Sequence, residues 1–274
     1  MLLTKLRLRR RGPHAELSRD ERRLIELPLK YLRSTEARNV KHVGSLRAEW
    51  TLYDQLCALL VQLLLHIQQK HSISRFEEAL LLLGYKILSH LRSIKACLLA
   101  GWHGTANSLL SLLMSDLNML MYLGFRRDLI DAWFAEGQDT YQTDPEFKRK
   151  FGEKAVADEL ERRGIKDNYE VFKIFRKTTH GSYWGVQAYT VDMQLVILAQ
   201  PPDFRLVLAT VGFASLFVSA LLHWLLMDEP SFGTPCRGQE YDAFRRIHKK
   251  LSKATGRFMA VVAKYLHATK GARP

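Results

Sequence analysis

The sequence predicts an all-α protein, a multi-helix bundle that folds as a single domain. Three observations predict it. Apolar residues recur at helical spacing along most of the chain, and the central apolar segments are too long for strands. No linker rich in Gly, Ser or Pro divides the 274 residues. The composition, 47% hydrophobic and 25% charged, is ordinary for a globular protein and indicates neither disorder nor a fibrous repeat.

Two capping boxes predict where two helices begin. In each, a serine hydroxyl and the carboxylate of a glutamate three residues later satisfy free backbone amides of the first turn. The pairs are Ser18 with Glu21, before a helix over 19–35, and Ser74 with Glu77, before a helix over 76–99.

Apolar periodicity predicts the central helices. A broad apolar stripe indicates a helix over 46–69, and the scarcity of polar residues over 105–123 indicates a helix surrounded by others. The break at 101–104 makes 76–99 and 105–123 an antiparallel hairpin. We expect Gly124 to end the second of these helices as its C-cap. The more polar chain beyond predicts short helices at 128–136, 145–151 and 153–163 and an aromatic one at 168–179.

The segment 206–227 holds 22 residues without a formal charge, which is long enough to cross a bilayer. A helix at the centre of a helical domain is also apolar on all sides. Because the segment contains His223, Trp224 and several small polar residues, we favour a buried core helix, with a membrane span as the alternative.

The net charge of +13 is concentrated at the two ends of the chain. Residues 1–50 hold 13 Lys/Arg and 6 Asp/Glu, residues 237–274 hold 10 and 2, and the remainder is near neutral. We therefore divide the chain into a basic N-terminal helical segment (1–45), a helical core (46–236) and a basic amphipathic C-terminal helix (237–274). The basic ends are either solvated helix faces or a surface for the phosphates of nucleic acid or of an anionic membrane.

The C-terminal helix shows the most regular pattern in the chain. Its apolar residues are spaced alternately three and four apart, which predicts a seam that docks on the body of the protein, on a second copy or partner helix, or on lipid. The seam residues are Phe244, Ile247, Leu251, Ala254, Phe258, Val261 and Tyr265. The residues predicted to bind nucleic acid are Arg245, Arg246, Lys249, Lys250, Lys253 and Arg257 on this helix, with Arg9, Arg10 and Arg11 near the N-terminus.

No motif for a metal, a nucleotide or another cofactor is present, so we expect none of these. Cys57, Cys97 and Cys236 are far apart and lack metal-ligand spacing, which fits buried thiols in a reducing cytoplasm. The cationic stretch at residues 1–11 is followed by no apolar run, so no secretory signal is predicted and the expected location is cytoplasmic.

One polar pair could carry chemistry. Arg176 and His180 are four residues apart and share a helix face. The guanidinium could hold a phosphate while the imidazole moves a proton to or from a ribose hydroxyl, without a metal. The alternative is that His180 hydrogen-bonds a neighbouring helix. The residues next to this pair are Thr179, Ser182, Tyr183 and Trp184.

Two short motifs carry a family resemblance. The run GWHGTANSLL from Gly101, before an apolar helix, and the stretch from Tyr169 to His180-Gly181-Ser182 resemble an uncharacterised bacterial helical family, domain of unknown function 5677, over roughly residues 50–225. That family usually has an arginine and a glutamate near the places where this chain has Ser111 and Ser115, with Asp116 close by.

The layout is also similar to the helical HEPN group, many of whose members are metal-independent ribonucleases of toxin or phage-defence systems. The motif of that group is an arginine, four to six residues, and a histidine, whereas three residues separate Arg176 from His180 here. The resemblance implies an RNA-binding or RNA-cleaving protein of a defence or stress system. The alternatives are a non-enzymatic protein-interaction module acting through 244–265 and a membrane-associated protein.

Overall fold

The computed structural model describes residues 33–34, 37, 40–41, 43–136, 145–165, 190–191, 194–195, 204–227 and 236–267. Within these residues the chain is an all-α multi-helix bundle, which confirms the predicted fold class. The predicted helix over 168–179 and most of the one over 19–35 lie outside the described residues.

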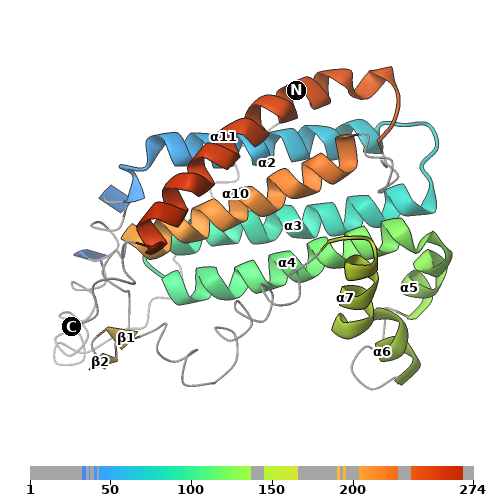
Figure 1. Ribbon diagram of the computed structural model, residues 1–274, viewed down its shortest axis with the longest axis horizontal. Helices are drawn as coiled ribbons and strands as arrows, with labels where there is room; N and C mark the ends of the chain where they lie inside the picture. Colours follow the sequence, from blue (N-terminus) through green and yellow to red (C-terminus); the bar gives the residue numbers. More distant parts are fainter. Residues whose placement is uncertain are drawn as a thin grey trace, which may run out of the picture.

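Five long helices form the body of the described structure (Figure 1). They are α2 (Arg47–Gln68), α3 (Arg75–Ala100), α4 (His103–Phe125), α10 (Phe204–Leu226) and α11 (Asp242–His267). α3 and α4 form the predicted antiparallel hairpin, and α11 lies across α10 and α2. Their buried side chains make one continuous hydrophobic core.

Both ends of α3 follow the sequence closely. At the start of α3 the Ser74 hydroxyl accepts the Glu77 backbone N–H at 3.2 Å, and the Glu77 carboxylate accepts the Ser74 N–H at 2.8 Å, which confirms the predicted capping box. At its end Gly101 adopts the left-handed conformation with φ of 83°. Because that conformation is strained for residues with a Cβ, glycine is the residue that allows α3 to stop there.

Gly124 does not end α4, so the predicted C-cap is wrong. The helix continues through Gly124 to Phe125. A Cβ atom at Gly124 would collide with the six-membered ring of Trp224 on α10. The close contact between the two helices therefore explains why glycine occupies this position. Gly124 and Trp224 are 100 residues apart in the chain, so local sequence patterns cannot predict the contact.

Smaller elements gather at the C-terminal end of α4 (Figure 1). The Tyr122 hydroxyl donates to the Lys150 carbonyl at 2.7 Å and so ties α4 to the helix that contains Lys150. These elements confirm the short predicted helices: a 3-10 turn (Arg127–Leu129), α5 (Ile130–Glu136), α6 (Pro145–Phe151) and α7 (Glu153–Arg162). Two strands of two residues, β1 (Thr190–Val191) and β2 (Gln194–Leu195), pair antiparallel.

α10 packs against α2, α3, α4 and α11, and most of its described side chains are buried. This position agrees with the core-helix interpretation of 206–227. By length and composition alone, however, α2 and α4 are also apolar enough to cross a membrane, so 206–227 is one of three such helices among the described residues.

Candidate nucleic-acid interface

The apolar seam predicted for α11 is rotated from the face that the helix buries. Ile247 and Val261, two of the predicted seam residues, are 49% and 42% exposed, whereas His248 and Thr255 are fully or almost fully buried. The two polar side chains can be buried because each is hydrogen-bonded: His248 Nε2 lies 3.0 Å from the Ser219 carbonyl, and the Thr255 hydroxyl donates to the Leu251 carbonyl at 3.0 Å.

The side chain of Arg245 is partly buried against the body of the protein. Its Nε donates to the Leu226 carbonyl at 2.8 Å, Nη2 to the Cys236 carbonyl at 2.9 Å, and Nη1 to the Gly238 carbonyl and the Asp242 carboxylate. These bonds fasten the last turn of α10 to the start of α11. Four hydrogen bonds of Arg245 are thus made inside the chain, and its predicted contact with nucleic acid stays a prediction.

The other predicted cations of α11 form one exposed stripe. At 100° per residue, Arg246, Lys250, Lys253 and Arg257 project within about 40° of a single line, with Lys249 at its edge. All five are exposed, and the buried face with His248 and Thr255 lies on the opposite side of the helix. Lys264 continues the same line, so the stripe reaches about 27 Å along the helix at 1.5 Å per residue. We call these six residues the basic stripe.

The first half of the basic stripe borders two hollows of the surface. One, of about 570 Å³, is lined by Arg237, Gly238 and Arg245 together with Arg246 and Lys249. The other, of about 500 Å³, is lined by Lys250 and Lys253 and again by Arg246 and Lys249. Because the two hollows share two cations, they lie next to each other on the surface.

No described carboxylate neutralises the basic stripe. The ion pair that the structure has within α11 joins Arg245 to Asp242, off the stripe. Among the described residues, none of the six stripe cations has an ion-pair partner. A charged group that has no partner within the chain keeps its full attraction for an external anion.

The predicted catalytic pair lies outside the described residues. This holds for Arg176 and His180, for their neighbours Thr179, Ser182, Tyr183 and Trp184, and for Arg9, Arg10 and Arg11. Their predicted roles stay predictions. In the described part of the chain, no group of three or more His, Cys, Asp or Glu side chains could hold a metal ion.

One polar cluster was missed in the sequence. Asp116 on α4 is 7% exposed, and its carboxylate accepts Lys86 Nζ at 2.8 Å and lies 3.0 Å from His90 Nε2, both on α3. Lys86 and His90 are four residues apart and share a face of α3. Two polar residues at this spacing, and a lone acid in an otherwise apolar neighbouring helix, were the available signal. The predicted hairpin placed the two helices side by side without giving their register.

A scan against protein-family models and searches of curated proteins and of solved structures found no match to this chain. The resemblance to the helical family 5677 and to the HEPN layout therefore rests on the sequence motifs alone and stays a prediction.

Proposed function

We propose that the protein binds nucleic acid through the basic stripe of α11. The observation that carries the proposal is the alignment of Arg246, Lys250, Lys253 and Arg257 on one solvent-facing line, opposite the face that anchors the helix. A helix that is packed on the protein by one face and cationic on the other holds its charges at fixed positions on the surface. Such a surface gains affinity for a polyanion by releasing the counterions condensed on the phosphates.

The experiment measures fluorescence anisotropy of labelled RNA and of duplex DNA, each about 20 nucleotides long, at several salt concentrations. The test variant is R246Q/K250Q/K253Q. The matched control is R92Q/K148Q/K154Q, because these three cations are also exposed and have no ion-pair partner among the described residues. Both variants lose the same net charge, so only the position of the charge differs between them.

We expect wild type to bind with an affinity that falls steeply with salt. Each phosphate contact adds about 0.7 to the slope of log affinity against log salt for a single strand and about 0.9 for duplex DNA. The test variant should lower that slope by about two to three, and the control should leave it close to wild type. Absence of binding at low salt, or an equal loss in both variants, would overturn the proposal.

A membrane surface is the competing polyanion, because clustered cations also attract anionic lipids. Vesicles of phosphatidylcholine with and without phosphatidylserine separate the two cases by co-sedimentation. Binding to the anionic vesicles without any binding to RNA or DNA would replace the nucleic-acid proposal with a membrane one.

Interaction with a partner helix or a second copy stays a prediction. In the described structure, α11 uses Phe258 and Val262 to pack within its own chain, and the exposed apolar residues Ile247 and Val261 flank the basic stripe. Light scattering of wild type and of an I247S/V261S variant tests this alternative. If these residues hold a dimer, the variant should dissociate and its measured molar mass should be lower than that of wild type.

A further inference from the structure

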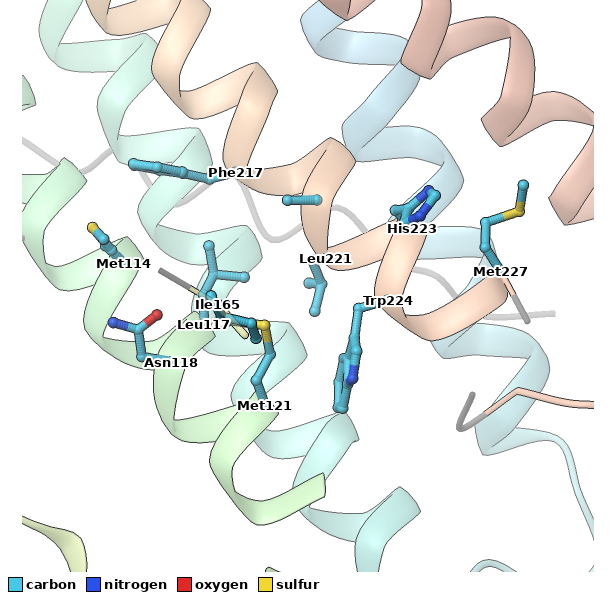
Figure 2. Close-up of a pocket in the computed structure, with 11 residues that line it drawn as sticks. Met114, Leu117, Asn118, Met121, Ile165, Phe217, Leu221, His223, Trp224 and Met227 are labelled. Carbon is cyan, nitrogen blue, oxygen red and sulfur yellow. The ribbon is translucent and has the colours of Figure 1, made fainter. Parts of the chain in front are cut away.

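A cavity of about 250 Å³ lies between α4 and α10, on a part of the molecule that the basic stripe does not include. Figure 2 shows its walls, with Met114, Leu117 and Met121 on α4 and with Phe217, Leu221 and Trp224 on α10. Ile165, just after α7, also lines it. The cavity is therefore built by elements from three regions of the chain.

The walls are almost entirely apolar. Among the described residues that line the cavity, the polar side chains besides the indole of Trp224 are those of Asn118 and His223. Methionine sulfur packs favourably against aromatic rings, and Phe217 and Trp224 present aromatic surfaces. Apolar walls of this kind disfavour charged ligands, because a charge loses hydration against them without gaining a partner.

One buried donor in these walls lacks an acceptor. Trp224 is 7% exposed, and among the described residues its indole Nε1–H has no hydrogen-bond partner. A buried N–H without an acceptor is unfavourable, because it has lost its hydrogen bond to water, and such groups are rare in native proteins. A molecule in the cavity whose acceptor atom reaches this N–H would satisfy it.

The indole is held firmly at its place. Phe76 and Phe125 meet it edge to face, each with ring centroids 6.1 Å away, and Gly124 leaves the space that its six-membered ring occupies. Because three contacts set the ring position, the direction of the N–H bond is set as well.

We propose that this cavity binds a small, uncharged aromatic molecule that carries one hydrogen-bond acceptor, which the Trp224 N–H contacts. A dry cavity of about 150 Å³ holds benzene, so by proportion this one holds a ligand of about ten non-hydrogen atoms. A bicyclic aromatic ring with a hydroxyl or carbonyl oxygen has this size and chemistry. The inference is independent of the proposed nucleic-acid binding.

The experiment is isothermal titration calorimetry of the full chain with 2-naphthol and with naphthalene, which differ only in the hydroxyl group, whose oxygen is the acceptor for the Trp224 N–H. The first variant, W224F, keeps an aromatic ring and removes the N–H. The second variant, A220W, places a large side chain at Ala220, an exposed residue that lines the cavity. The matched control is L216W, because Leu216 is exposed on the same helix and does not line the cavity.

We expect wild type and L216W to bind 2-naphthol about fivefold or more tightly than naphthalene, which is the gain from one hydrogen bond. W224F should bind the two molecules equally, and A220W should bind neither. Circular dichroism establishes that each variant is folded, and A220W keeps the test decisive if W224F is not. The proposal is overturned if wild type does not bind 2-naphthol, or if A220W binds it as well as L216W does.

Discussion

Gly124 on α4 and Trp224 on α10 are in direct contact, and the contact exists because Gly124 has no side chain. The indole ring fills the space where a Cβ atom would stand. This relationship fixes how closely α4 approaches α10, and with it the wall of the cavity between them.

Replacing Gly124 with alanine should therefore destabilise the fold. The added methyl group overpacks the contact with Trp224 at a cost of about 1–3 kcal/mol, offset in part by up to about 1 kcal/mol of helix propensity. Urea denaturation measures the difference. The matched control is Gly256→Ala in α11, where a Cβ meets nothing within 4 Å, and this variant should be as stable as wild type or more stable. A Gly124→Ala variant that is also stabilised would contradict the close contact.

The substitution Asp116→Asn should lower stability by about 1–3 kcal/mol, because Asp116 is buried and its carboxylate accepts from two side chains of α3. Asp54→Asn is the control, since the Asp54–Lys95 pair is largely solvated and such pairs contribute about 0–1 kcal/mol. Chemical denaturation of both variants provides the comparison. Equal losses would mean that the Asp116 cluster is no more than a surface ion pair.

Arg245 and Arg246 are neighbours in the chain with opposite expected roles. Arg245→Ala removes the donors that three backbone carbonyls share and should lower the melting temperature by several degrees. Arg246→Ala should leave the melting temperature unchanged and weaken the binding of nucleic acid. Thermal denaturation and fluorescence anisotropy of the two variants test the assignment, which fails if Arg246→Ala is the more destabilised.

The stability should fall as the pH is lowered below about 6.5. Burial between α10 and α11 lowers the pKa of His248 from its ordinary value, an effect that the hydrogen bond to the Ser219 carbonyl opposes. The unfolded chain then binds a proton at His248 more readily than the folded chain does. Stability is consequently lost from pH 6.5 downward until the folded-state pKa is passed. Denaturation of wild type and of His248→Gln between pH 7 and 5 isolates this contribution, and parallel pH profiles would refute it.

The ribonuclease prediction for Arg176 and His180 is tested separately from binding. If it holds, the protein cleaves RNA in the presence of EDTA, and His180→Ala abolishes cleavage while it leaves the anisotropy titration with RNA unchanged. Gel analysis of labelled RNA gives the result. Cleavage that survives in His180→Ala would remove the imidazole from the mechanism.

Much of the fold followed from local patterns. The capping box at Ser74 and the positions of α6 and α7 depend on residues within a few positions of each other. Long-range contacts explain the failures. Gly124 was predicted to end a helix because its contact with Trp224, which is 100 residues away, cannot be recognised from the local sequence. The predicted seam of α11 was rotated from the buried face because it was drawn through apolar residues alone, whereas the helix also buries the polar residues His248 and Thr255.

The sequence by itself determined that the chain is helical, where its main central helices lie and that its positive charge is concentrated at the ends, since periodicity, capping and charge are properties of neighbouring residues. Only the tertiary structure decided that Arg245 is hydrogen-bonded within the chain while Arg246 is exposed, that Asp116 meets His90, and that Trp224 lines a cavity. Those outcomes depend on the rotation and register of packed helices, which are set by the fit of side chains from distant parts of the chain.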